Sequence, residues 1–211
     1  MCSSDLADVV GAVSCQSTAA GTYLSRCFVG DRDGMLWRLD IGARTAANWG
    51  MEFFYDPYLL LPDPKPAPGS TKRAPVMEAP SLSFTPYTNQ LVVTWASGDV
   101  DNIEETTHTN FVASVTEPAA SGSGCTQQCR TPQPDKANWV RFFTGGEKVM
   151  GPPLTYAAVT YFATFTPGSG TNCSPGTGAL WGVDFVKHGD TIHDLVPRLD
   201  ADENAATVDW V

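Results

Sequence analysis

The stretch from Phe28 to Asp40 constrains the fold more than any other part of this chain, because it predicts two short strands around one tight turn. Asp33 and Gly34 are a strong hairpin signal, since a tight hairpin needs a residue with positive φ and glycine adopts it without steric cost. Every second residue after the turn is large and apolar: Met35, Trp37 and Leu39. This period of two predicts a strand with these side chains on one face.

The composition favours an all-β, turn-rich protein that works outside the cytoplasm. Only 17% of the 211 residues are charged, whereas 42% are hydrophobic and 19 are glycine and 16 proline. The net charge of -10 excludes a nucleic-acid backbone as a partner, and its spread along the chain indicates a solubility feature. No apolar run approaches the roughly 18 residues that a membrane-spanning helix needs, so we expect no membrane span in this chain.

The organisation of the chain is predicted from its composition shifts. Residues 1–6 lack the basic and apolar regions of a signal peptide, and we expect them to be a non-native leader in front of an internal piece of a longer protein. Residues 7–186 carry the strand patterns, and residues 187–211 are a polar tail or the start of another unit. The proline-rich stretch 59–80 is either a linker between domains or a connection that crosses between sheets, and the similar patterns on both sides favour the connection.

Repeated phrases predict an array of β units. The phrase Gly34-x-Leu-Trp-x-Leu-Asp40 recurs as Gly178-x-Leu-Trp-x-Val-Asp184, with a similar strand phrase at Val92 to Asp99. Four-stranded units that cannot bury their faces alone stack around an axis as a β-propeller. Blades of about 40–50 residues would place about four in this length, so we expect part of a larger propeller, with a β-sandwich as the alternative. Trp37 and Trp181 are then expected to pack between blades.

The cysteines lie in polar loops between the predicted strands, where disulfides of exported proteins commonly fall. Five are disulfide candidates, namely Cys15, Cys27, Cys125, Cys129 and Cys173. Free thiols and a zinc site remain alternatives, although zinc would require close pairs with histidines nearby, and the sequence does not define the connectivity.

Three phrases, in this order, resemble PilY-type proteins, which are type IV pilus assembly factors and tip adhesins with a C-terminal β-propeller of quinoprotein-like blades. Phe28 to Asp40 resembles their "G-D-x-x-G-x-L-W-R-x-D" phrase, Leu91 to Asn102 is similar to their "G-T-G-D" phrase, and Gly146 to Asp184 is similar to their "G-x-P-L … L-y-x-l-D" phrase. The residues that carry the resemblance are Gly30, Asp31, Gly34, Trp37, Asp40, Gly98, Asp99, Gly151, Pro153, Trp181 and Asp184.

The resemblance implies a non-enzymatic propeller region that acts in pilus biogenesis and surface adhesion. It also implies pilin or minor pilins and a host or abiotic surface as partners, and an exported protein at the cell surface, on the pilus or at the outer membrane. It further places the aromatic stretch Met51 to Tyr58 at the approach to the next blade. The alternative is a fragment of a quinoprotein-type propeller dehydrogenase.

The residues offer few candidates for chemistry. The place where the family often carries a calcium loop, Ser14 to Arg26, has no acidic residue, and calcium needs several oxygen ligands at short spacing. Substitute metal ligands are Asp99, Asp101, Asn102 and Glu104, a second acidic stretch at 200–204, and the pair His188 and His193 with Asp190 and Asp194. We predict solvated loops at all three places, and we predict that Asp31 and Asp33 bond to backbone N–H groups of a turn.

Overall fold

The computed structural model describes residues 8–17, 24–85, 88–117, 137–168 and 176–186. These residues form strands and two short 3-10 helices, and none of the helices is long and apolar enough to cross a membrane. The elements are β1 (Ser14–Gln16), β2 (Arg26–Gly30), β3 (Leu36–Asp40), η1 (Ala46–Asn48), β4 (Gly50–Tyr55), η2 (Pro57–Leu60), β5 (Ser81–Phe84), β6 (Leu91–Ala96), β7 (Asn110–Thr116), β8 (Ala137–Phe143), β9 (Lys148–Val149), β10 (Leu154–Tyr156), β11 (Val159–Thr166) and β12 (Thr177–Asp184). The prediction of an all-β chain is confirmed.

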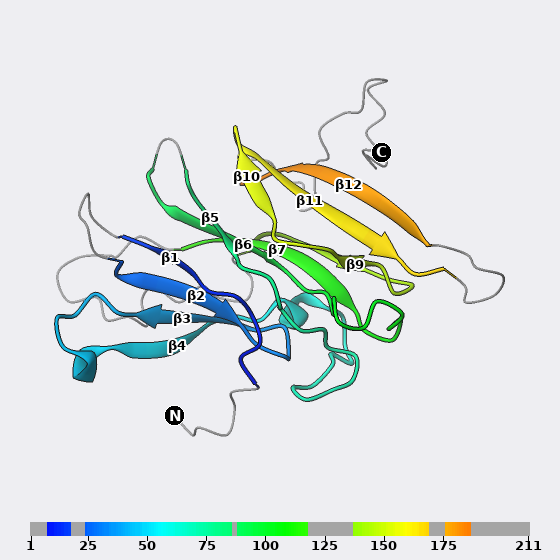
Figure 1. Cartoon of the computed structure of the whole chain (residues 1–211), viewed down its shortest axis with the longest axis horizontal. Helices are drawn as coiled ribbons and strands as arrows, with labels where there is room; N and C mark the ends of the chain where they lie inside the picture. The colour runs from blue at the N-terminus through cyan, green and yellow to red at the C-terminus, as the bar shows by residue number, and fades with distance from the viewer. Residues whose placement is uncertain (1–7, 18–23, 86–87, 118–136, 169–175, 187–211) are drawn as a thin grey trace.

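The strands form three antiparallel sheets, each built from consecutive strands (Figure 1). Sheet 1 has the order β1-β2-β3-β4 and sheet 2 the order β5-β6-β7-β8. In sheet 3 the short strands β9 and β10 both pair with β11, which pairs with β12. The sheets begin at Ser14, Ser81 and Lys148, 67 residues apart each time. The expected number of about four units is therefore wrong for the described residues, because long connections make each unit longer than the blade length used for the prediction.

The Phe28–Asp40 hairpin is present as predicted. Val29 of β2 pairs with Trp37 of β3, and Gly34 in the turn between the strands has φ of 82°. The stretch Met51 to Tyr58 differs from its predicted role at the approach to a second blade. Its first residues form β4, which pairs with β3 and completes sheet 1. Residues 8–13 form one isolated bridge, between Val9 and Asp31, and β1 begins at Ser14.

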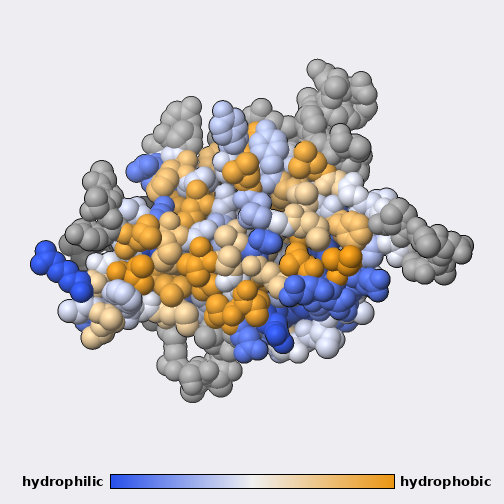
Figure 2. All heavy atoms as spheres, viewed as in Figure 1, coloured by the Kyte–Doolittle hydropathy of each residue, from blue (hydrophilic) through white to orange (hydrophobic). Residues whose placement is uncertain are grey.

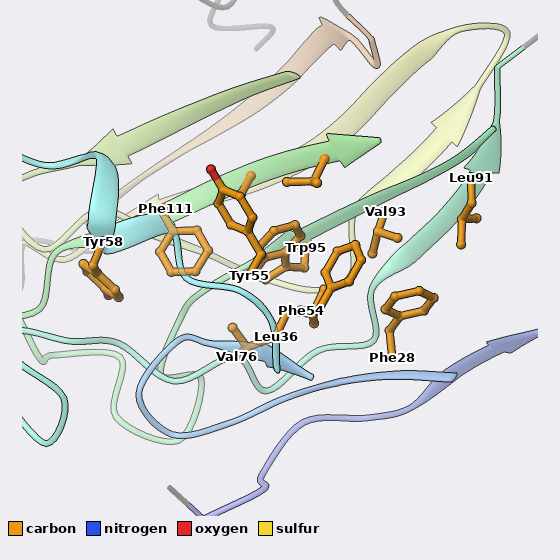
Figure 3. Close-up of a cluster of buried hydrophobic side chains, with 12 residues drawn as sticks. Phe28, Leu36, Phe54, Tyr55, Tyr58, Val76, Leu91, Val93, Trp95 and Phe111 are labelled. Atoms are coloured by element: carbon orange, nitrogen blue, oxygen red, sulfur yellow. The ribbon is translucent and has the colours of Figure 1, made fainter. Parts of the chain in front are cut away.

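Sheet 2 is the middle layer and is buried on both faces. One face packs against sheet 1, and the two layers share a core that includes Phe28, Phe54, Val93 and Trp95. Figure 3 shows these side chains meeting between the strands of the two sheets. The opposite face packs against sheet 3. There Trp139 and Phe143 of sheet 2 join Phe162, Trp181 and Val183 of sheet 3 in a second cluster. Burial on both sides explains why β6 and the first six residues of β7 are fully buried.

The disulfide prediction is confirmed for one pair. Cys15 of β1 and Cys27 of β2 are directly opposite in the antiparallel register and are bonded to each other. Cys125, Cys129 and Cys173 lie outside the described residues. The bond ties the edge strand of sheet 1 to the strand that carries the Gly30-Asp31 turn.

The proline-rich stretch 59–80 runs from sheet 1 to sheet 2 and bonds to both. The N–H of Val76 donates to the carbonyl of Asp31 after β2, at 3.0 Å, and the carbonyl of Pro75 accepts from the N–H of Gly98 after β6, at 2.9 Å. Its residues 73–76 are buried. A segment that cannot form a central strand thus lies between two sheets as a packed connection.

Candidate functional site

A fully buried carboxylate holds the turn between β2 and β3. Asp31 Oδ1 accepts hydrogen bonds from the N–H groups of Asp33 and Met35, both at 2.9 Å, and Oδ2 accepts from Trp37 Nε1 at 2.8 Å. Burial raises the pKa of Asp31, and these three hydrogen bonds partly offset the rise. The prediction that Asp31 bonds to the backbone of a turn is confirmed, and its two oxygens are engaged in holding that turn.

Asp33 accepts a hydrogen bond from a backbone N–H, as predicted, but this N–H belongs to a segment far along the chain. Its Oδ2 accepts from the N–H of Gly69 at 2.8 Å, and its backbone carbonyl accepts from Arg73 Nη1 at 3.0 Å. Both donors lie in the proline-rich connection. Asp33 therefore ties this connection to the hairpin turn instead of capping its own turn.

The glycines of the two Gly-Asp turns are required by close contacts between sheets. A Cβ at Gly30 would lie 2.2 Å from Cβ of Val76, which precedes sheet 2. A Cβ at Gly98 would lie 2.4 Å from the carbonyl oxygen of Val149, in β9 of sheet 3. The turn after β2 thus touches the connection that leads to sheet 2, and the turn after β6 touches the first strand of sheet 3. The two Gly-Asp turns therefore hold comparable places between neighbouring sheets.

The repeated aspartates at the ends of β3 and β12 also share a role. Asp40 Oδ1 accepts from the N–H of Gly42 at 3.2 Å, and Asp184 Oδ1 accepts from the N–H of Val186 at 3.3 Å. Each carboxylate bonds two residues ahead where its strand ends, as in an Asx turn. In the third phrase, Gly151 has φ of 98° and Pro153 is buried. The motif residues described here are all engaged in backbone geometry or packing.

The two motif tryptophans differ in burial. Trp181 lies on the face of sheet 3 that packs on sheet 2, stacked on Phe162 with ring centroids 6.0 Å apart, and Arg141 lies 4.1 Å from its ring centroid. Its expected packing between sheets is confirmed. Trp37 lies on the outer face of sheet 1, half-buried, in edge contact with Phe53. The expectation that Trp37 packs between two sheets is wrong for the described residues, because the face of β3 that meets sheet 2 carries Leu36 and Arg38.

A buried ion cluster joins sheets 1 and 2. Arg26 of β2 and Arg38 of β3 both bond to the carboxylate of Glu117, which follows β7, and Arg38 also pairs with Glu52 of β4. Arg26, Arg38 and Glu117 are 8%, 2% and 5% exposed. The sequence reasoning missed this cluster. The available signal was Arg38, a charged residue inside the predicted strand after the turn, whereas Arg26 and Glu117 stood in predicted loops.

A second buried pair, also missed, fixes the proline-rich connection. Arg73 bonds to both carboxylate oxygens of Asp56, at 2.7 and 3.2 Å, and its guanidinium lies 4.6 Å from the ring centroid of Tyr58. Tyr58 donates its hydroxyl hydrogen to the carbonyl of Thr109 and accepts from the N–H of Ala74. Burial raises the pKa of Tyr58, so this phenol stays protonated and keeps its role as a donor.

The acidic loop between β6 and β7 is occupied by a lysine ammonium of the chain itself. Lys148 Nζ donates to the carbonyls of Asn102 at 2.8 Å and Glu105 at 2.9 Å, although the lysine is only 1% exposed. Burial lowers the pKa of Lys148, and the charges of Asp99 and Glu105 oppose that change. Within the described residues no three His, Cys, Asp or Glu side chains are grouped to hold a metal ion.

The predicted metal ligands of this loop take other positions. Asp99 Oδ1 accepts from the N–H of Asn102 at 3.1 Å, and the side chains of Asp101, Asn102 and Glu104 are exposed. The other candidates, residues 200–204 and the pair His188 and His193, lie outside the described part of the chain. The calcium alternative has no grouped ligand set within the residues that the structure places.

These features define an all-β, propeller-like architecture, in which successive antiparallel sheets are joined by Gly-Asp turns. No protein-family model matches the chain, and no curated protein matches it in sequence. Among solved structures, the chain is similar to the crystal structure of the Pseudomonas aeruginosa PilY1 C-terminal domain, with a TM-score of 0.54 and 14% identity over 82% of this chain. The chain spans 46% of the length of that domain. At this identity the similarity is one of fold.

Proposed function

We propose that this chain is part of the propeller of a PilY-type protein that acts, without enzymatic activity, in type IV pilus biogenesis and surface adhesion. The observation that carries the proposal is the similarity of fold to the PilY1 C-terminal domain over 82% of the chain. The order of the three motif phrases and their equivalent places in the sheets support it independently of the fold comparison. The Cys15–Cys27 disulfide agrees with export to an oxidising compartment.

The proposed partners are pilin or minor pilins and a host or abiotic surface. The motif acids support a scaffold role, because Asp31, Asp40 and Asp184 are used to hold turns and strand ends. A scaffold of this kind presents its loops for binding.

Deletion of the gene in a bacterium that carries it tests the proposal. We expect fewer surface pili in the sheared fraction, smaller twitching zones and weaker attachment to glass, all restored by the intact gene but not by the empty vector. Unchanged piliation and attachment would contradict the proposed role.

The enzymatic alternative has its own test. We expect the full-length gene product, mixed with a quinone cofactor, to show no stoichiometric binding by calorimetry. Tight one-to-one binding, together with dye-linked alcohol oxidation, would favour the quinoprotein-type dehydrogenase instead.

A further inference from the structure

An open hollow of about 540 Å³ lies where three segments meet. These segments are the turn after β2, the proline-rich connection at residues 69–77 and the loop after β6. Figure 2 shows hydrophilic side chains gathered over the loop after β6, at the lower right of that view. The volume lies within the range of about 300–1,000 Å³ that small-molecule sites occupy.

The walls of the hollow are held by backbone hydrogen bonds to the sheets. The carbonyl of Lys72 accepts from the N–H of Thr109 at 2.8 Å, and the carbonyl of Met77 accepts from the N–H of Ala12 at 3.0 Å. Buried Arg73 fixes the middle of the connection through Asp56 and the carbonyl of Asp33. The hollow is therefore formed before a ligand arrives, which lowers the entropic cost of binding.

The lining contains hydrogen-bond donors and acceptors, and it contains both positively and negatively charged side chains. Arg32, Asn102 and half-buried His108 can donate, and Asp33, Asp99 and Asp101 can accept. Lys148 brings a further positive charge close to Asp99. The three carboxylates are balanced by Arg32, Arg73 and Lys148, so the lining favours a ligand without net charge that hydrogen-bonds in both directions. Val10, Pro75 and Met77 add an apolar part to the same surface.

We propose that this hollow binds a neutral oligosaccharide. A sugar hydroxyl donates and accepts through one oxygen, as the mixed lining requires, and the C–H face of a sugar ring can pack on half-buried Val10 and Met77. The carboxylates and Asn102 bind vicinal hydroxyls, while Arg32 and His108 bind ring or hydroxyl oxygens. With aliphatic contacts in place of aromatic stacking, we expect a Kd on the order of 1 mM for a disaccharide. Several copies on one surface would raise the apparent affinity.

The inference rests on the proposed function for its biological setting alone, because sugar binding would supply the contact for surface attachment. Binding is measured on the purified chain, whereas piliation is measured in cells. Loss of sugar binding with normal piliation would overturn this inference alone, and the reverse result would overturn the proposed function alone.

Saturation-transfer NMR on the full chain tests the inference with lactose, cellobiose and N,N′-diacetylchitobiose. Sialyllactose and spermidine serve as an anionic and a cationic probe. Asp101→Ala removes an exposed acceptor, and Thr71→Lys places a long side chain in the hollow. The matched control is Ile103→Ala, since Ile103 is exposed in the same loop but does not line the hollow. Circular dichroism and thermal melting verify that each variant is folded.

We expect transfer to at least one neutral disaccharide, its loss in Asp101→Ala and Thr71→Lys, and its retention in Ile103→Ala. Transfer to none of the three disaccharides would overturn the proposal. Equal transfer in all variants would place binding elsewhere and would also overturn it. Stronger binding of spermidine or sialyllactose than of the disaccharides would show a charge-selective hollow and would contradict a neutral ligand.

Discussion

At the scale of single residues, the charges that matter are buried and paired. Glu117 accepts from two arginines of the neighbouring sheet, and Lys148 donates to carbonyls of the acidic loop. A buried charge that loses its partner cannot recover solvation, so these residues are far more sensitive than exposed ones. The chain as a whole carries a negative net charge. At a few buried positions, however, a carboxylate or an amine holds two sheets together.

Glu117→Gln should destabilise the chain strongly. The change removes the carboxylate that buried Arg26 bonds to and leaves buried Arg38 with Glu52 alone, at a cost of about 3–5 kcal/mol in the free energy of unfolding. Urea denaturation followed by tryptophan fluorescence measures the difference. Glu104→Gln, at an exposed acid, is the control and should change the unfolding free energy by less than about 0.5 kcal/mol. Similar midpoints for both variants would show that the ion cluster contributes little.

Trp37→Phe should raise the pKa of Asp31 further, because it removes the indole N–H that favours the carboxylate form. A carboxyl whose pKa is raised on folding stabilises the fold below its unfolded pKa, and this contribution is lost as the pH rises through the folded pKa. In the variant the loss should extend to higher pH. Titration of the Asp31 Cγ resonance and urea midpoints across the acidic range measure both effects. An unchanged Asp31 pKa would contradict the assigned hydrogen bond.

At the scale of elements, the close contact between neighbouring sheets depends on glycines, which have no Cβ. Gly30 ends β2 and Gly98 follows β6, and each of these is the second strand of its sheet. Gly30 lies against the connection that leads to sheet 2, and Gly98 lies against β9 of sheet 3. Close approach of two backbones is possible only where no Cβ intervenes. The Gly-Asp phrase therefore serves two purposes: the glycine permits the contact, and in sheet 1 the aspartate holds the turn beside it.

Gly98→Ala should weaken the contact between sheets 2 and 3. Its Cβ would lie 2.4 Å from a backbone oxygen that cannot rotate away, and overpacking of this kind costs about 1–3 kcal/mol. Thermal unfolding by circular dichroism measures the loss. The matched control is Gly178→Ala in β12, where the nearest atom would be 3.5 Å away. Equal melting temperatures for the two variants would refute the proposed close contact.

At the scale of the whole molecule, both outer faces of the three-sheet stack are apolar. On sheet 3, Leu154 and Tyr156 of β10 are 63% and 73% exposed, and Leu180 of β12 is 47% exposed. On sheet 1, half-buried Trp37 and exposed Met51 lie on the face away from sheet 2. Trp37 and Trp181 occupy corresponding strand positions, and within the described part of the chain a sheet packs against Trp181 but not against Trp37. Large exposed apolar faces mark surfaces that associate with a partner.

The isolated chain should therefore self-associate through these faces. We expect the weight-average mass in sedimentation equilibrium to rise with concentration. The double substitution Leu154→Lys and Tyr156→Lys should reduce this rise without lowering the melting temperature, because both side chains are exposed. The control pair is Leu59→Lys and Leu60→Lys, at exposed leucines of η2. A monomer at all concentrations, or equal association of both double variants, would contradict the expectation.

The local architecture could be predicted from the order of the residues, because a hairpin or a turn depends on a few neighbouring residues. Alternation with a period of two located the Phe28–Asp40 hairpin, Asp33-Gly34 located its turn, and the echo at Gly178 to Asp184 indicated repeated units. The cysteines of β1 and β2 were among the disulfide candidates, although their pairing was not fixed.

Which faces are buried and which charges meet depends instead on how the sheets pack against each other. Arg26 lies 91 positions from Glu117 in the chain, and Lys148 binds a loop 46 positions away, so no local pattern links them. Alternation also cannot tell which face of a strand meets a neighbour. In β3 the apolar face with Trp37 lies on the outside of sheet 1. The opposite face meets sheet 2, where Arg38 pairs with the carboxylates of Glu52 and Glu117. Whether a side chain is buried depends on the sheet that packs against it. The residues that form this contact lie far apart in the sequence, so a local pattern does not show which face is buried.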